Sequence, residues 1–357
     1  MSQPITTTLP YWGQINGLIS QDAVSLFTTK ITDKSIDQAK LYRVDSNREH
    51  PTLTALNLPV GMEGLTAMAD STVMLIGRDG YLYQIDWQAK KLAQISEQST
   101  FDLMNKTQKE ADELNRPHPT AIAIASLKDG VAVLYPEYLL VWAYQNHKLG
   151  DCIGNIRLNS ILQTTDNQND NALTINQATT LAVSSDGNWL VVGDSQGLVS
   201  SFHVNAERTA ILHSSSELLH QGAVTALCFE PIAQQFFSAG ADKQLLRTHV
   251  QGKLQGIDRG KASQHTEMIR AMVVSSGTGE RLYTGSDDKS VKSWQFDKGQ
   301  PNTCKDDLVK IRILSVCQYL NQTSVLTVGT DQSLRFITVD NEGKLTNVAQ
   351  IIKDGYQ

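Results

Sequence analysis

A β-rich unit recurs along this chain of 357 residues, and the repeat limits the fold more than any other feature. One copy, HTEMIRAMVVSSGTGERLYTGSDDKSVKSWQF at 265–296, contains three short β-rich runs separated by the turn signals SSGTGE and GSDDKS. The runs include Val273, Tyr283 and Trp294, and such β-branched and aromatic residues favour strands. Each unit therefore predicts three strands and no helix.

The spacing of the units indicates the architecture. The slot that Trp294 takes in the third run recurs at Val44, Ile85, Trp142, Phe202, Thr248, Trp294 and Ile337. Four gaps lie between 41 and 46 residues, close to the period of about 40 to 45 residues of a four-stranded propeller blade. The other two gaps, of 57 and 60 residues, carry insertions. A short run after the third strand, such as KLTNVAQII at 344–352, can supply an outer strand.

These units predict an all-β fold: a single seven-bladed β-propeller with four-stranded antiparallel blades and one short helical insertion near 99–115. We expect one domain over 1–357, with blades at about 13–60, 61–98, 118–160, 175–216, 220–258, 265–310 and 311–352 and insertions at 99–117 and 161–174.

The sixth unit resembles a WD40 repeat. It has the residues of that family at His265, Ile269, Ala271, Thr284, Gly285, Asp288 and Trp294. The resemblance implies a buried, hydrogen-bonded tetrad of His265, Thr284, Asp288 and Trp294, because buried polar groups are costly unless they satisfy one another. It also implies a WD40-type propeller.

The other units keep only parts of this pattern. Blade five keeps His220, Ser238 and Asp242 with Thr248 in the Trp slot, and blade seven keeps Thr327 and Asp331 with Ile337 in that slot. Blade two keeps Asp79, blade three has Pro136 in the Asp slot, and blade four has Gln196 and Phe202 in the Asp and Trp slots. Blade one is recognised by its strand rhythm.

Ring closure is expected to depart from the family. Many WD40 rings borrow an outer strand from the N-terminus, but here the run at 344–352 can complete blade seven. We therefore expect residues 4–9 to pair on the outer edge of that blade, and blades one and seven to close the ring by side-chain packing.

The two insertions differ in chemistry. Residues 99–115 place Phe101, Met104 and Leu114 on one helical stripe after a capping box of Ser99 and Asp102, which predicts an amphipathic helix. Its stripe either packs onto the propeller or docks a partner. Residues 163–171, QTTDNQNDN, contain no apolar residue and predict a mobile loop.

Composition excludes several classes. Hydrophobic residues make up 40% of the chain and charged residues 19%, which fits a packed core better than global disorder. No apolar run approaches the roughly 20 residues that span a bilayer, and the start lacks a signal peptide, so we expect a cytoplasmic protein with no membrane partner. The four cysteines lie far apart, which argues against a disulfide framework or a zinc site. The net charge of −6 makes a nucleic-acid partner unlikely.

Several strings resemble catalytic motifs. Gly193–Gly197 fits G-x-S-x-G, but the nucleophile elbow needs a helix after the turn and a strand-like run follows instead. The pairs Asp287/Asp288 and Asp306/Asp307 are explained by turns. The chain has no GxxxxGK[ST], HExxH or EF-hand loop, so we expect no catalytic residue, no metal and no cofactor.

The family resemblance implies a contact face of exposed loops around the central channel. Its frequent contact positions map here to Thr66, Arg78, Tyr135, Gln177, Thr179, Ser195, Thr225, Ala241, Met268, Arg270, Asp287, Arg312, Leu314 and Thr330. Arginine and tyrosine are favoured at interaction hot spots, so the cluster favours a binding face over ordinary solvated rim residues.

The sequence therefore predicts a non-catalytic scaffold that binds a protein or peptide on this face, with acidic groups on the partner as one way to meet Arg78, Arg270 and Arg312. A propeller enzyme with an unrecognised channel site is the alternative, and a nucleic-acid-binding propeller is a weaker one. The partner, its pathway and the oligomeric state are left open.

Overall fold

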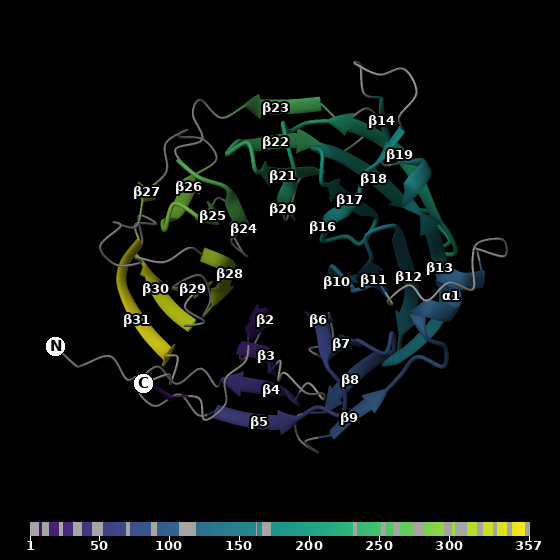
Figure 1. Cartoon of the computed structure of the whole chain (residues 1–357), viewed down its shortest axis with the longest axis horizontal. Helices are drawn as coiled ribbons and strands as arrows, with labels where there is room; N and C mark the ends of the chain where they lie inside the picture. The colour runs from purple at the N-terminus through teal and green to yellow at the C-terminus, as the bar shows by residue number, and fades with distance from the viewer. Residues whose placement is uncertain are drawn as a thin grey trace.

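The strands surround a central opening in chain order, as Figure 1 shows. The computed structural model describes residues 7–8, 14–20, 24–30, 38–44, 53–68, 72–86, 91–106, 119–161, 163–165, 173–230, 234–250, 255–259, 265–274, 281–295, 302–303, 313–319, 324–330, 334–340 and 345–353. Among these residues the strands form seven sheets of four or five strands, which we call blades one to seven, and one sheet of two strands. The all-β propeller fold predicted from the repeat is confirmed.

The first four blades follow one another with the innermost strand first. Blade one contains β2 (Gln14–Ser20), β3 (Val24–Lys30), β4 (Gln38–Val44) and β5 (Leu53–Asn57). Blade two contains β6 (Met62–Ala67), β7 (Val73–Gly77), β8 (Leu82–Asp86) and β9 (Lys91–Gln94). Blade three contains β10 (Ala123–Leu127), β11 (Gly130–Leu134), β12 (Tyr138–Gln145) and β13 (Lys148–Arg157). Blade four contains β16 (Ala178–Val183), β17 (Trp189–Asp194), β18 (Leu198–Val204) and β19 (Ile211–Leu218).

The last three blades have the same order. Blade five contains β20 (Val224–Phe229), β21 (Gln235–Gly240), β22 (Leu245–His249) and β23 (Gln255–Arg259). Blade six contains β24 (Ile269–Val274), β25 (Arg281–Ser286), β26 (Val291–Gln295) and β27 (Asn302–Thr303). Blade seven contains β28 (Ile313–Tyr319), β29 (Ser324–Gly329), β30 (Leu334–Val339), β31 (Leu345–Lys353) and β1 (Thr7–Thr8).

The outer edge of blade seven is formed as the sequence predicts. Strand β31 pairs antiparallel with β30, and Thr7 and Thr8 pair in parallel with Ile352 and Lys353 of β31. The C-terminal strand therefore completes the blade, and the N-terminal segment adds a fifth strand outside it. Residues 4–6 and 9 lie outside the described residues.

The core lies between neighbouring blades and follows from the apolar pattern of the second strands. In β7 (VMLIG) and β11 (GVAVL) every residue is buried, because a blade packs against neighbours on both of its faces. The outer strand β9 (KLAQ) contains no buried residue. Continuous apolar runs therefore mark the middle of a blade and mixed runs mark its rim.

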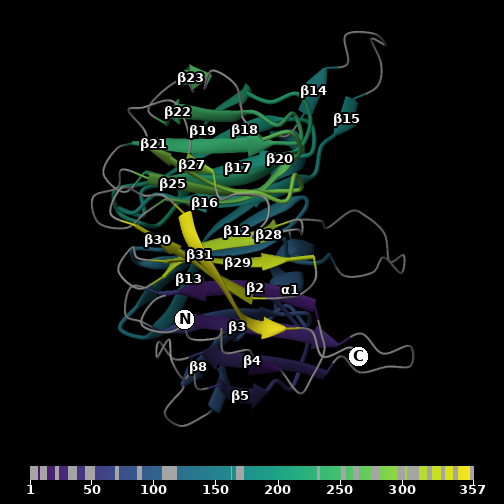
Figure 2. The same cartoon turned by 90° about the vertical axis from the view of Figure 1, so that its left-hand side faces the viewer.

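The described parts of the two insertions lie on one face of the ring, as Figures 1 and 2 show. The helix α1 (Thr100–Lys106) begins where predicted: Ser99 Oγ accepts a hydrogen bond from Phe101 N at 3.2 Å, as an N-cap residue does. The rest of the predicted helix lies outside the described residues. Phe101 and Met104 are buried against blades two and three, so these two residues of the stripe pack onto the propeller.

The second insertion differs in part from the prediction. A short 3-10 helix, η1 (Leu158–Ser160), precedes β14 (Gln163–Thr165), which pairs antiparallel with β15 (Leu173–Ile175). Residues 163–165 therefore form a strand and not the predicted loop, because they pair with residues 173–175. Among the described residues, no helix has the length and apolar character that a membrane crossing requires.

A β-bulge marks the start of most inner strands. The register between the first and second strands shifts by one residue in blades one, two, four, five, six and seven. The extra residues at these shifts are Asn16, Glu63, Thr179, Thr225, Arg270 and Leu314. A bulge redirects a side chain out of the regular alternation, and it therefore decides what this residue can reach.

Candidate interaction face

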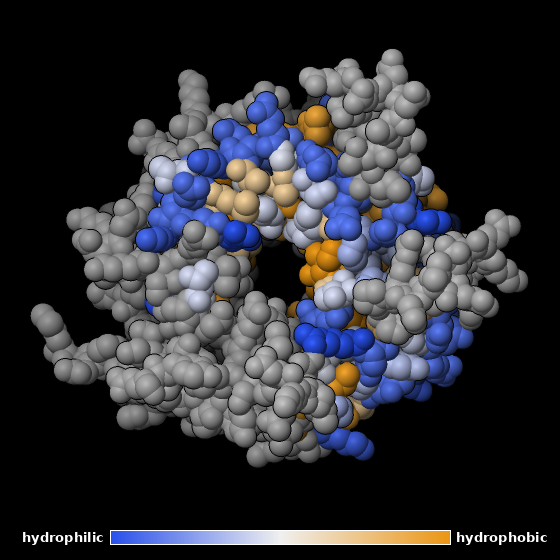
Figure 3. Space-filling view, in the orientation of Figure 1, coloured by the Kyte–Doolittle hydropathy of each residue, from blue (hydrophilic) through white to orange (hydrophobic). Residues whose placement is uncertain are grey.

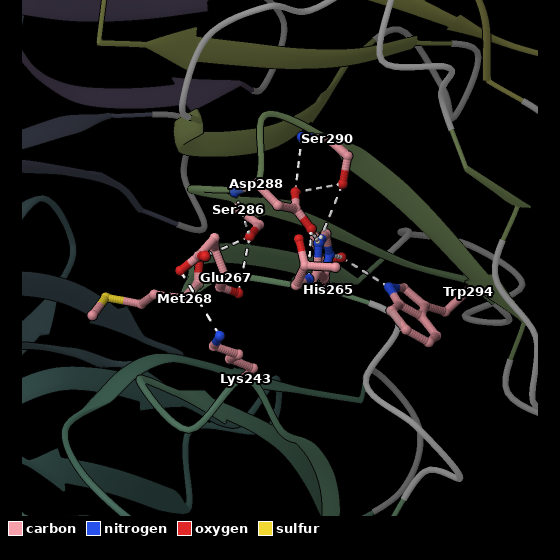
Figure 4. A network of polar contacts seen from close by, with 10 residues as sticks. Lys243, His265, Glu267, Met268, Ser286, Asp288, Ser290 and Trp294 are labelled. Carbon is pink, nitrogen blue, oxygen red and sulfur yellow. Dashed lines mark hydrogen bonds and ion pairs between the residues drawn. The ribbon is translucent and has the colours of Figure 1, made fainter.

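The predicted tetrad residues of blade six form a continuous chain of hydrogen bonds, shown in Figure 4. Trp294 Nε1 donates to Thr284 Oγ1 at 2.8 Å, and Thr284 Oγ1 lies 2.7 Å from His265 Nε2. His265 Nδ1 lies 2.7 Å from Asp288 Oδ2. With a neutral imidazole, the indole donates to the hydroxyl, the hydroxyl to Nε2, and Nδ1 to the carboxylate, so every buried polar group has a partner.

Burial and hydrogen bonding set the charges of this tetrad. Burial, the largest effect, lowers the pKa of His265 below its ordinary 6.5, although Asp288 acts in the opposite direction. Burial raises the pKa of Asp288, but hydrogen bonds from His265 and Ser290 outweigh it and hold that pKa below its ordinary 3.8. At neutral pH His265 is therefore uncharged and Asp288 is ionised. Their hydrogen bond connects the β25–β26 turn to the loop before β24.

Blades five and four build this joint from other residues. In blade five His220 Nε2 lies 2.9 Å from Ser238 Oγ and Nδ1 lies 3.0 Å from Asp242 Oδ1, while Thr248 occupies the Trp slot. In blade four Asn176 Nδ2 donates to Asp194 Oδ2 at 2.7 Å. The repeat pattern assigns Gln196 to the Asp slot, but the carboxylate of this joint belongs to Asp194, which lies two residues earlier and is fully buried.

The bulged residues of three blades join each blade to the next. The hydroxyl of Thr179 donates to the carbonyl of Val224 in blade five at 2.5 Å, and the hydroxyl of Thr225 donates to the carbonyl of Ile269 in blade six. In blade two the Glu63 carboxylate accepts a hydrogen bond from the backbone of Ala121 at 2.6 Å. Thr225, expected to contact a partner, therefore has a structural role in the seam between blades.

Blade six uses its bulge differently. Arg270 Nε donates to Asp287 Oδ1 at 3.0 Å and Nη2 donates to Asp287 Oδ2 at 2.7 Å, so two of the predicted face residues bind each other. The Arg270 side chain remains 38% exposed. The hydrogen bonds to Asp287 raise the pKa of Arg270 above its ordinary value, and the side chain is a permanent cation. The side chain of Met268, whose carbonyl accepts the backbone N–H of Asp287 at 2.9 Å, points away from the tetrad (Figure 4).

The remaining predicted face residues fall into two groups. Arg78 and Gln177 are exposed and Ser195 is half-buried; Gln177 lies on the loop before the bulged strand β16, and Arg78 and Ser195 lie on the β7–β8 and β17–β18 turns. Ser195 lies on the turn before strand β18, so the G-x-S-x-G string lacks the helix that a nucleophile elbow needs. Arg312 lies outside the described residues, and of Leu314 the structure gives only the backbone, at the bulge of β28.

Tyr135 is not at the surface, and this corrects the expectation that it contacts a partner. Its side chain is fully buried, and its hydroxyl lies 2.6 Å from Thr100 Oγ1 of α1. The ring of Phe101 packs edge-on against it with centroids 6.4 Å apart. In blade three the helix α1 therefore covers the position of Tyr135, and the repeat pattern does not predict this.

Hydrophilic and hydrophobic residues divide the face that carries α1, seen in Figure 3. Hydrophilic side chains border the central opening over blades two and six, and a hydrophobic patch borders it over β10 and β16. Charges along the hydrophilic part are largely paired: Lys243 Nζ of blade five lies 3.9 Å from Glu267 Oε2 of blade six, and Arg270 binds Asp287. Within the described ranges, no group of three or more His, Cys, Asp or Glu side chains could hold a metal ion.

Comparison with known proteins supports the reading of blade six. A family model described as WD domain, G-beta repeat, matches residues 259–295. Residues 259–295 are a WD40 repeat. This repeat contains Asp287 and Arg270 as well as the tetrad. A solved chain from "Crystal Structure of Mitotic Checkpoint Complex" is similar in fold, with a TM-score of 0.59, 13% sequence identity, and coverage of 82% of this chain and 80% of that chain. No curated protein sequence matches the chain.

Proposed function

We propose that this chain is a non-catalytic scaffold that binds a peptide or a partner domain on the loop face around the central opening. We also propose that the whole chain, 1–357, forms one propeller domain and acts in the cytoplasm, as composition and cysteine spacing favour. The observation that carries the proposal is the contrast on this face between residues engaged in the fold and residues left exposed.

The engaged residues make the face rigid. The tetrad of His265, Thr284, Asp288 and Trp294 fixes one turn, and Thr179 and Thr225 link successive blades through backbone carbonyls. A rigid surface loses little conformational entropy when a partner binds, so more of the contact energy is expressed as affinity.

The exposed residues supply contacts of the kinds that interfaces prefer. Arg78, Gln177 and Arg270 are exposed and Met268 is half-buried, and arginine and methionine are enriched at protein interfaces. WD40 repeats are commonly found in interaction scaffolds, and the similar solved chain comes from a complex. Both facts support a binding role rather than a catalytic one.

A capture experiment tests the proposal. The wild-type chain and a Gln177→Ala, Met268→Ala, Arg270→Ala variant are used to capture partners from a lysate of the source cell. A control variant carries Lys148→Ala and Leu212→Ser, which change exposed residues of the β12–β13 turn and of β19, away from the face. The proposal predicts a partner that the face variant loses and the control retains. A partner lost only by the control would move the site to the rim and contradict it.

A further inference from the structure

Arg270 differs from the other three bulged residues whose side chains the structure describes. Glu63, Thr179 and Thr225 each use a side-chain oxygen to hydrogen-bond the backbone of the next blade. Arg270 holds the same position in blade six, but its guanidinium binds Asp287 of its own blade. Among the described residues, Arg270 therefore makes no hydrogen bond to the next blade, and its positive charge lies at the surface.

Stability alone does not explain why the bulged residue of blade six binds Asp287 of its own blade. An ion pair whose arginine is 38% exposed contributes little to folding, because solvent screens the attraction and two side chains lose freedom. The threonine hydroxyls at the same position in blades four and five make hydrogen bonds that are half-buried. Arg270 is therefore better explained by what it presents to solvent.

The geometry of the pair leaves one edge of the guanidinium open. A guanidinium has five N–H donors in one plane. Asp287 takes Nε–H and one N–H of Nη2, which form one edge of the fork. The second N–H of Nη2 and one N–H of Nη1 lie side by side along the end of the guanidinium, and the described residues place no acceptor there. This edge has the spacing for a second bidentate contact with an oxyanion.

Asp287 also holds that edge in a fixed direction. Its carboxylate is only 12% exposed, and its backbone N–H donates to the carbonyl of Met268 at 2.9 Å. A side chain held in place before binding loses little rotamer freedom on binding, so it is a better recognition group than a free arginine.

Resting on the proposed function, we propose that the open edge of Arg270 binds a carboxylate of an aspartate or glutamate in the partner. The charges nearby favour this ligand over a phosphate. The carboxylate of Asp287 already binds Arg270, so a dianionic phosphate would meet about twice the repulsion from it that a monoanionic carboxylate meets. Met268, whose carbonyl accepts the backbone N–H of Asp287, is half-buried and offers an apolar contact to the stem of the acidic residue.

The test uses phage-displayed random 12-residue peptides as the probe. Peptides are selected on the full wild-type chain, and those that the Gln177→Ala, Met268→Ala, Arg270→Ala variant no longer binds are kept as face binders. Each acidic residue of these peptides is then changed to its amide. Binding is measured on wild type, on Arg270→Thr, and on Lys148→Thr as the control. Arg270→Thr places at the bulge the residue that Thr179 and Thr225 show to be compatible with the fold, and its melting curve checks this.

The proposal predicts that one acidic residue recurs and that its amide variant binds wild type about 10-fold or more weakly but binds Arg270→Thr no worse than the acid does. Face binders whose acidic residues show no coupling to Arg270 would overturn the inference and leave the proposed function standing. Selection of peptides that ignore all face substitutions would overturn both. A phosphorylated serine that replaces the glutamate and binds more tightly would show that phosphate, not carboxylate, is the ligand.

Discussion

Thr248→Val is expected to stabilise the chain, although it removes a polar group. Thr248 occupies the Trp slot of blade five, is fully buried, and its hydroxyl has no hydrogen-bond partner among the residues that the structure describes. A buried hydroxyl without a partner costs about 1 to 3 kcal/mol, and valine has nearly the same shape and the same preference for strands. We therefore expect the free energy of unfolding to rise by about 1 kcal/mol.

The same change in the tetrad serves as the matched comparison. Thr284 is also fully buried, but its hydroxyl bonds to His265 and accepts from Trp294. Thr284→Val leaves the buried Nε2 of His265 and the half-buried Nε1 of Trp294 without their partner, at about 1 to 3 kcal/mol each, so we expect a loss of about 2 to 4 kcal/mol. One chemical substitution should thus have opposite signs at two positions.

Urea unfolding followed by tryptophan fluorescence measures both effects. With a slope of about 3 kcal/mol/M, the midpoint should rise by about 0.3 M for Thr248→Val and fall by about 1 M for Thr284→Val, with the slope unchanged. A fall of the midpoint for Thr248→Val would refute the reasoning, because it would mean that this hydroxyl is stabilised in the fold. Equal losses at both positions would refute it as well.

Three other changes test the packing and charges of the fold. Thr225→Val removes the hydrogen bond to blade six and should lower the free energy of unfolding by about 1 kcal/mol, measured by the same urea assay. Phe101→Ala removes a buried ring between α1 and blade three and should cost about 3 kcal/mol; a loss under about 0.5 kcal/mol would mean that α1 is not docked. Acidification should also destabilise the chain. Because the pKa of His265 in the fold lies below 6.5, the unfolded chain takes up the proton more readily as pH falls through that value. Asp288, whose pKa in the fold lies below 3.8, adds a further loss below pH 3.8. The urea midpoint should therefore be lower at about pH 5.5 than at about pH 7.5, and His265→Gln should reduce this difference; an equal difference in both proteins would contradict the assignment.

The repeat made the propeller predictable because its signal is local. A buried middle strand such as VMLIG is apolar throughout, and the turn after it carries Asp79 and Gly80, so period and strand order follow from residue types. The tetrad geometry in blade six followed from one well-preserved set of residues. The outer strand at 344–352 followed from the same strand rhythm.

The roles of single face residues were not predictable in this way. Thr225 bonds to a carbonyl 44 residues away in the next blade, and this contact depends on how two blades pack rather than on either repeat. Tyr135 takes a slot that is open in other blades, but α1 covers it, since Thr100 binds its hydroxyl. Asp194 could have been found, because an acidic residue directly after Gly193 can cap the same turn.

The central claim is that a partner binds the loop face, and hydrogen exchange on the captured complex tests it most directly. The account predicts slower exchange on binding in the loops that contain Gln177, Met268 and Arg270, with no change in the outer strands β9, β13 and β19. Protection confined to those outer strands, with unchanged exchange on the loop face, would contradict it.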